Sequence, residues 1–293
     1  MGASDFHLIA LELGAEEQML DGALDALEEV EAGETAFLPE YLAWSESGSG
    51  RAFARLVAFA QERDINIITT LNLGAELAED LPGHDPAERY NALTIFTRHG
   101  AVHVPQAKFS TQSFEMDKSL DGPGIGVTPY ARINRVKLDV DDALLDACFL
   151  ICSDLVVMQQ LTPRDLACDL MVVLGNFAYG AERVAMRLLG RALECRAAAT
   201  AVLVNAYQLS NDKRRPPLAN KVEEVLDGTS TGKPRAKWPS PQSMRAAFHV
   251  YDDEDAHDFV SMCKLPRRGR IAVPRSRWAA PVAMGVYPVT VVL

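Results

Sequence analysis

Short apolar runs alternate with amphipathic segments along most of the chain. Residues 6–13 and 65–71 are apolar runs of strand length, whereas residues 16–31 and 51–63 carry apolar side chains at helical spacing. Strands that alternate with helices are typical of layered α/β domains. We therefore predict an α/β fold, in which Gly33 ends the first helix.

Further apolar runs continue this alternation toward the C-terminus. Residues 90–97 and 101–107 are two such runs, separated by Arg98-His99-Gly100, and this spacing predicts a β-hairpin. Other strands are expected at residues 35–39, 147–151, 170–174, 200–206, 246–251, 271–273 and 286–293, and other helices at residues 162–168 and 181–199.

Two segments lack such a pattern. Residues 108–135 have no clear period and hold several glycines, which predicts a loop; the pattern Gly122-x-Gly124-x-Gly126 lacks the spacing of a phosphate-binding loop and joins no strand to a helix. Residues 210–241 are rich in Lys, Arg, Pro, Ser and Gly, which is typical of a long excursion. Because strand patterns resume afterwards without an evident boundary, we expect a single domain spanning residues 1–293.

Composition narrows the possible partners and location. The chain is 48% apolar and 24% charged, and its formal net charge is −11. An acidic surface repels nucleic acids and anionic membranes, so neither is expected as a partner. The sequence has no secretion signal and no uninterrupted apolar run of about 18 residues, which predicts a cytoplasmic protein.

The cysteines favour reduced thiols over disulfides or metal sites. There are five, an odd number in a long chain without a secretion signal. None forms a Cys-x-x-Cys pair or lies beside a histidine cluster, so we expect neither a metal ion nor another cofactor.

One cysteine has the sequence context of a nucleophile. Cys152 directly follows the apolar run 147–151, and a thiol at a strand end can point into a cleft above the sheet. Glu40 and Lys108 each close an apolar run of their own. Because a free cysteine has a pKa of about 8.5, such a thiol needs a base and a stabilising charge, which a carboxylate and an ammonium supply. Each residue also has an ordinary explanation, as a turn cap, a solvated strand end or a buried small side chain.

The order and local sequences of these residues resemble the carbon–nitrogen hydrolase (nitrilase) superfamily. Glu40 and Lys108 are 68 residues apart, and Lys108 and Cys152 are 44 apart, which fits the family. The resemblance covers roughly residues 5 to 210, and the chain diverges from about residue 211. It rests on Phe37-Leu38-Pro39-Glu40, Ala107-Lys108-Phe109, Ile151-Cys152-Ser153-Asp154-Leu155, and Arg191-Ala192-Leu193-Glu194 followed by Val204-Asn205.

The resemblance implies a four-layer α-β-β-α sandwich and a Glu-Lys-Cys triad. Glu40 would be the general base, Lys108 would stabilise the oxyanion, and Cys152 would form a thioester. Glu115 would be an additional glutamate that positions substrate and tunes Lys108. The implied substrate-contacting residues are Tyr41, Ser153, Asn176, Phe177 and Tyr179, although Tyr41, Phe177 and Tyr179 are equally compatible with core packing, and Glu115 with a surface position. A homodimer or larger homo-oligomer is also implied.

Departures from the family pattern narrow the substrate. Nitrile-hydrolysing members usually carry Trp-Glu after the cysteine, whereas this chain has Ser153-Asp154, which favours a small amide or carbamoyl substrate. The membrane-bound acyltransferase branch requires transmembrane helices, which are not predicted here. The remaining alternatives are a nitrile hydrolase, a catalytically silent nitrilase-fold protein that binds a partner or metabolite, and an unrelated α/β protein whose three residues align by chance.

Overall fold

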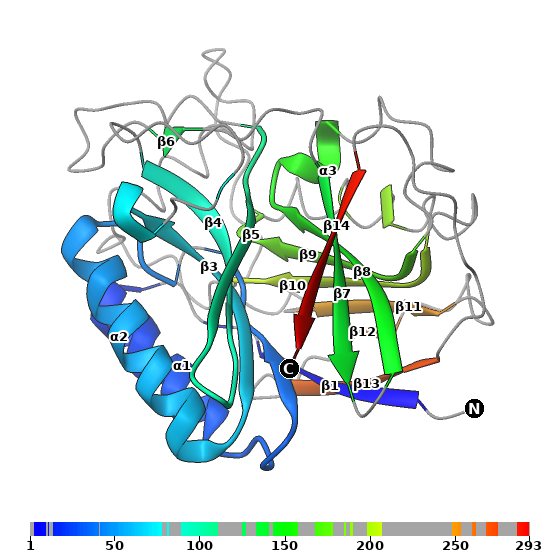
Figure 1. Ribbon diagram of the computed structural model, residues 1–293, viewed down its shortest axis with the longest axis horizontal. Coiled ribbons are helices and arrows are strands. Elements are labelled where there is room, and N and C mark those ends of the chain that lie inside the picture. Colours follow the sequence, from blue (N-terminus) through cyan, green and yellow to red (C-terminus); the bar gives the residue numbers. More distant parts are fainter. Residues whose placement is uncertain are drawn as a thin grey trace.

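Two β-sheets and the helices beside them make up the fold, which we describe from a computed structural model of the 293-residue chain (Figure 1). The structure describes residues 3–9, 11, 14–40, 42–77, 81, 89–110, 125–126, 133–140, 143–157, 168–177, 185, 188–189, 198–206, 248–252, 260–261, 268–274 and 286–292.

Within the described residues, the first sheet has seven strands, and it contains the N-terminal strand. Its order is β13-β1-β2-β3-β4-β5, and β6 pairs with β4. β1, β2 and β3 are parallel neighbours, whereas β4 and β5 form an antiparallel hairpin. The strands are β1 (Ala3–Ile9), β2 (Thr35–Phe37), β3 (Asn66–Leu73), β4 (Arg89–Phe96), β5 (Val102–Ala107), β6 (Ile125–Gly126) and β13 (Arg268–Pro274).

In the part of the chain that the structure describes, the second sheet also has seven strands, in the order β12-β11-β10-β9-β8-β7-β14. β8, β9 and β10 are parallel, and β14, near the C-terminus, runs parallel to β7. The strands are β7 (Ile133–Val140), β8 (Ala143–Ile151), β9 (Cys168–Gly175), β10 (Ala198–Asn205), β11 (Phe248–Asp252), β12 (Val260–Ser261) and β14 (Val286–Val292).

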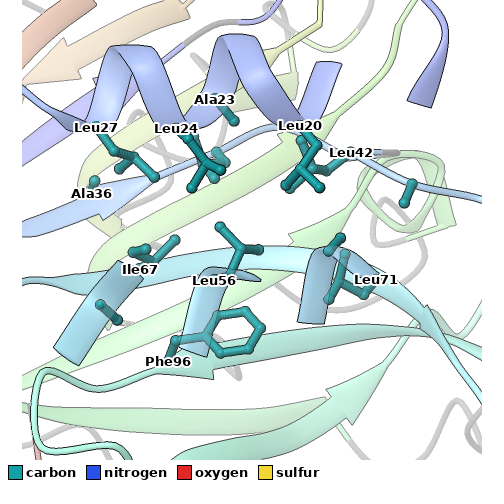
Figure 2. Close-up of a cluster of buried hydrophobic side chains, with 14 of the residues drawn as sticks. Leu20, Ala23, Leu24, Leu27, Ala36, Leu42, Leu56, Ile67, Leu71 and Phe96 are labelled. Atoms are coloured by element: carbon teal, nitrogen blue, oxygen red, sulfur yellow. The ribbon is translucent and has the colours of Figure 1, made fainter. Parts of the chain in front are cut away.

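Two helices cover one side of the first sheet: α1 (Glu16–Leu27) and α2 (Glu46–Arg63). Apolar residues recur on α1 every three or four positions, which places them on one buried face. Figure 2 shows this face meeting Leu56 of α2 and strand residues Ile67, Leu71 and Phe96. The hydrophobic effect of this burial holds the helices on the sheet.

The two sheets face each other across a second apolar cluster. Phe6 and Phe37 of the first sheet stack with ring centroids 5.2 Å apart, and Phe37 meets Phe149 of the second sheet edge-on at 6.0 Å. Alternate residues of β8, such as Cys148 and Leu150, belong to a third cluster instead. Because successive side chains of a strand point to opposite faces, this third cluster lies on the outer face of the second sheet.

The structure confirms the α/β class and most of the expected elements, including the β4–β5 hairpin, and corrects several boundaries. α1 ends at Leu27, and Gly33 lies in a later turn with φ +85°, where its N–H donates to the Asp64 carbonyl at 2.6 Å. α2 begins five residues before position 51, because the Ser45 side chain accepts from the Gly48 N–H and caps the helix.

Corrections also apply to residues expected in a loop or in helices. Residues 133–135 belong to β7 rather than to the loop, and residues 125–126 form β6. Cys168 begins β9, and residues 198–199 begin β10, so neither belongs to a helix. Most of the two segments expected to be helical, and residues 210–241, lie outside the described part of the chain.

The structure also contains a short 3-10 helix (Ala75–Leu77) and a four-residue helix, α3 (Asp154–Val157). Among these described helices, none is both long and apolar enough to span a bilayer.

Candidate active site

Glu40 lies three residues after β2, in a segment fixed by neighbouring backbone groups. The Leu38 N–H donates to the Ile68 carbonyl at 2.9 Å, and the Thr69 hydroxyl donates to the Pro39 carbonyl at 3.2 Å. These bonds hold the chain in position as it leaves the sheet. The Glu40 side chain is fully buried, and Asn91 Nδ2 on β4 donates to its Oε1 at 2.8 Å.

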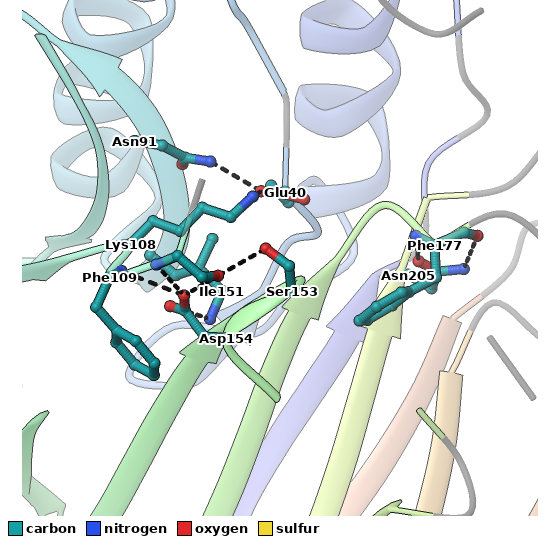
Figure 3. A network of polar contacts seen from close by, with 10 residues as sticks. Glu40, Asn91, Lys108, Phe109, Ile151, Ser153, Asp154, Phe177 and Asn205 are labelled. Carbon is teal, nitrogen blue, oxygen red and sulfur yellow. Dashed lines mark hydrogen bonds and ion pairs between the residues drawn. The ribbon is translucent and has the colours of Figure 1, made fainter. Parts of the chain in front are cut away.

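Lys108 is the first residue after β5 and points toward Glu40 (Figure 3). Its Nζ lies 2.9 Å from Glu40 Oε1, and its side chain is fully buried. Its backbone N–H donates to the Asn91 carbonyl at 2.8 Å. Asn91 therefore binds the Glu40 side chain and the Lys108 backbone. A buried ion pair is weak evidence for stability, because desolvation opposes its attraction, but it is a reasonable sign of a functional site.

Cys152 follows β8 in a strained backbone conformation. Its φ is +48°, a left-handed value that costs a non-glycine residue about 1–2 kcal/mol. Its N–H donates to the Leu174 carbonyl at 3.0 Å, and its carbonyl accepts from the Leu155 N–H at 3.2 Å as α3 begins. Strain of this kind clusters at functional sites, and a nucleophile on a tight turn between a strand and a helix is one established form of it.

A hydrogen bond between the sheets lies close to these residues. Gln106 Nε2 on β5 donates to the Phe149 carbonyl on β8 at 2.7 Å. Gln106 precedes Lys108 by two positions, and Phe149 precedes Cys152 by three. This bond helps to align the strand ends that carry the lysine and the cysteine.

The Glu40 carboxylate and the Lys108 ammonium both act on the Cys152 thiol. Burial raises the pKa of this thiol well above its ordinary value, and the Glu40 charge and a hydrogen bond with Glu40 raise it further. The Lys108 charge and the Asn176 backbone N–H act in the opposite direction. The resting thiol is therefore protonated and lies beside a carboxylate that is placed to accept its proton.

Ser153 and Asp154 join the cysteine turn to the residues after Lys108. The Ser153 and Ser110 hydroxyl oxygens are 2.7 Å apart, and Asp154 accepts hydrogen bonds from the Ser110 hydroxyl and backbone. Burial raises the pKa of Asp154 to about 7, opposed by the Lys108 charge and by these hydrogen bonds.

The elevated pKa of Asp154 predicts a pH-dependent stability. A carboxyl group whose pKa rises from 3.8 to about 7 on folding stabilises the fold fully below about pH 4, and this contribution is lost as the pH rises through 7. We expect Asp154→Asn to remove this dependence, so that the free energy of unfolding of the variant rises relative to wild type by up to about 4 kcal/mol between pH 4 and pH 8. Urea unfolding of both proteins across this range measures the difference. A difference that stays constant with pH would contradict the elevated pKa.

Of the other predicted site residues, the structure describes Asn176 and Phe177 but not Tyr41, Glu115 or Tyr179. Asn176 directs its backbone N–H toward the thiol, whereas the Phe177 side chain packs in the third apolar cluster. Phe177 is held there because its N–H and carbonyl both bond to the Asn205 side chain, at 2.6 and 3.0 Å. This packing favours the core role that the sequence had left open for Phe177. Tyr41, Glu115, Tyr179 and residues 191–194 lie outside the described residues, and their roles stay predictions.

Sequence reasoning missed two residues that position the site. Asn91 is a buried amide that lies between Tyr90 and the apolar residues Ala92 and Leu93 of β4, and its position in this strand was an available signal. Ser110 follows Lys108 by two residues and had no comparable signal. In the described part of the chain, no group of three or more His, Cys, Asp or Glu side chains is arranged to hold a metal ion.

Solved structures with the same fold belong to carbon–nitrogen hydrolases. A CN-hydrolase superfamily protein from Xanthomonas campestris, with an arsenic adduct in its active site, has a TM-score of 0.61 and 12% identity, over 94% of this chain and 91% of that chain. An amidase from Nesterenkonia sp. AN1 has a TM-score of 0.52 and 12% identity, over 94% of each chain.

A glutamine-dependent NAD(+) synthetase from Cytophaga hutchinsonii shares the fold over part of its length. Its TM-score is 0.54 and its identity 13%, over 92% of this chain and 43% of the synthetase. No protein-family model and no curated protein matches this sequence. The chain therefore has the fold of the carbon–nitrogen hydrolase (nitrilase) superfamily, as the sequence resemblance predicted.

Proposed function

We propose that this protein is a thiol-dependent hydrolase that cleaves a non-peptide C–N bond in a small amide or carbamoyl compound. The observation that carries the proposal is the meeting of Glu40, Lys108 and Cys152 at one buried site. The Glu40 and Lys108 side chains are 2.9 Å apart, and both charges act on the Cys152 thiol. A carboxylate, an ammonium and a thiol in contact are the groups that acyl transfer through a thioester requires.

In the first half of the reaction, Glu40 accepts the thiol proton as the Cys152 sulfur bonds to the carbonyl carbon. The carbonyl π electrons move to oxygen, and the Lys108 charge stabilises the resulting oxyanion. When the tetrahedral intermediate collapses, the C–N bond breaks and the leaving nitrogen takes the proton from Glu40. Ammonia or an amine is released, and the acyl group remains on Cys152 as a thioester.

In the second half, water replaces the amine. Glu40 accepts a proton from water as its oxygen bonds to the thioester carbon, and collapse of the second tetrahedral intermediate breaks the C–S bond. The thiolate recovers the proton from Glu40, and a carboxylic or carbamic acid leaves. Glu115 fits this scheme as a second glutamate that positions substrate and tunes Lys108.

The proposal extends to the layering and assembly of the molecule. A second helical layer outside the second sheet would complete an α-β-β-α sandwich. Ala185 and Leu189, which are helical, buried and four residues apart, belong to the cluster on that outer face and support such a layer. We further propose a homodimer or larger homo-oligomer, as the family resemblance implies, and a cytoplasmic location, as predicted from the sequence.

A screen for ammonia release tests the proposed reaction. The panel contains small aliphatic amides, N-carbamoyl amino acids, ω-amides, glutamine and the corresponding nitriles. We expect turnover of at least one amide or carbamoyl compound and none of the nitriles, because Ser153-Asp154 replaces the Trp-Glu of nitrile-hydrolysing relatives. Turnover of nitriles alone would show that the proposed substrate class is wrong. Binding of panel members without turnover would identify the catalytically silent alternative.

A further inference from the structure

One buried carboxylate contacts the segments that carry both Lys108 and Cys152. Asp154 Oδ1 accepts from the Phe109 N–H at 3.2 Å, the Ser110 N–H at 2.9 Å and the Ser110 hydroxyl at 2.7 Å. Its other oxygen, Oδ2, accepts from the Ile151 N–H at 3.2 Å. Figure 3 shows Asp154 between Phe109 and Ile151, beneath the Lys108–Glu40 pair.

From this geometry we propose that Asp154 is a positioning residue that fixes the Lys108 ammonium relative to the Cys152 sulfur. The inference rests on the proposed function, and it adds a role that the triad alone does not include. Asp154 need not touch substrate, since it acts through the two residues that do.

The contacts on the Lys108 side support a positioning role. The backbone N–H of Lys108 itself donates to the Asn91 carbonyl on β4. The next two backbone N–H groups along the chain, those of Phe109 and Ser110, both donate to Asp154. Loss of the carboxylate would release this second anchor just where the chain leaves β5. A lysine whose backbone is held on one side only samples more positions, and its ammonium loses alignment with the developing oxyanion.

The hydrogen bonds on the Cys152 side of Asp154 act together with those on the Lys108 side. Asp154 holds the N–H of the residue before Cys152, and the residue after it, Ser153, contacts the Ser110 hydroxyl. When Ser110 donates to Asp154, its oxygen accepts from Ser153, so the polar groups form one consistent chain. The left-handed cysteine turn is thereby bound on both flanks to the segment that follows Lys108.

Asp154→Asn tests the proposal, and Asp169→Asn is its matched control. Asp169, on β9 of the second sheet, is also a buried carboxylate, and it accepts the Asp146 N–H at 2.9 Å. It lies at the opposite end of β9 from the Cys152 turn. We expect Asp154→Asn to lower kcat by about a hundredfold with a much smaller change in KM, because the amide NH2 group cannot accept the Ile151 N–H and the resulting misplacement of the reacting groups affects the chemical step. Asp169→Asn is expected to keep the wild-type kcat.

A second readout needs no substrate. The rate of Cys152 alkylation by iodoacetamide, followed by peptide mass spectrometry as a function of pH, reports the apparent pKa of the thiol. Glu40 after β2 and Lys108 after β5 are the charged groups that act on this thiol. Because a displaced Lys108 favours the thiolate less, the profile of Asp154→Asn should move to higher pH, and that of Asp169→Asn should not.

The two readouts separate failure of the proposal from failure of the proposed function. If wild type hydrolyses no amide, the alkylation profiles still decide the positioning role. A folded Asp154→Asn protein with the wild-type profile overturns it, as does an equal change in Asp169→Asn. Should Asp154→Asn not fold, Ser110→Ala removes only the bridging hydroxyl and retains both backbone bonds. It should shift the profile in the same direction by a smaller amount, and an unchanged profile would overturn the proposal.

Discussion

Replacement of Cys152 by alanine abolishes hydrolysis in the proposed mechanism, and the protein stays folded. The sulfur forms the bond to the substrate carbon, so its removal leaves no nucleophile, and we expect the turnover number to fall by at least about a thousandfold. The side chain is small and its backbone bonds to Leu174 and Leu155 do not involve sulfur, so the fold should tolerate the change. Ammonia release and circular dichroism measure the two effects.

Cys148→Ala is the matched control for this variant. Cys148 lies on β8, four residues before Cys152, and is fully buried in the same apolar cluster. Its loss removes no part of the proposed triad, so turnover should remain close to wild type. Hydrolysis that survives in Cys152→Ala, or that disappears equally in Cys148→Ala, would exclude Cys152 as the nucleophile.

Glu40→Gln is expected to reduce turnover by about a hundredfold to ten-thousandfold, the usual contribution of a general base. Glutamine retains an oxygen that can accept from Asn91 and Lys108, so the shape of the site is largely kept. It cannot take the thiol proton. It also removes the carboxylate that pairs with the fully buried Lys108 ammonium, and breaking a buried pair costs about 3–5 kcal/mol.

Steady-state kinetics and urea unfolding of this variant measure both effects. Glu34→Gln provides the comparison, because Glu34 also bonds a basic side chain, with its Oε2 2.5 Å from His7 Nε2, but lies away from Cys152 before β2. Turnover in Glu34→Gln should remain near wild type. A Glu40→Gln protein with unimpaired turnover would show that another group is the base.

The sequence predicted much of the candidate site because its three main residues each end an apolar run. Strand ends are visible in a single sequence, and the identities of Glu40, Lys108 and Cys152 then suggest the chemistry. Their meeting depends on contacts between two sheets, which local sequence does not encode. Asn91 binds Glu40 within the first sheet, from 51 residues away in the chain, and Ser110 contacts Ser153 of the segment that follows β8; both were missed because these contacts are long-range.

The strand and helix boundaries that were predicted wrongly also depend on long-range contacts or on local capping. Residues 133–135 join β7 because that strand pairs with Val286 and its successors, about 150 positions later in the chain. The helix expected at residues 51–63 begins at Glu46 instead, because a loop had been expected for the serines and glycines at residues 45–50, yet Ser45 caps α2 and Gly48 fits against the Glu16 carboxylate, where a Cβ would approach within 2.5 Å. Small residues there serve close packing at a helix start rather than a loop.

Mass spectrometry of an acid-quenched reaction with an amide found in the screen observes the covalent step itself. Peptide mapping should find the acyl group of the substrate on Cys152, and ammonia should appear in a burst ahead of the free acid while the thioester accumulates. The same acyl group should be absent from Cys152→Ala. Ammonia released at the full rate with no acyl group on Cys152, or with the acyl group on another residue, would contradict hydrolysis through a Cys152 thioester.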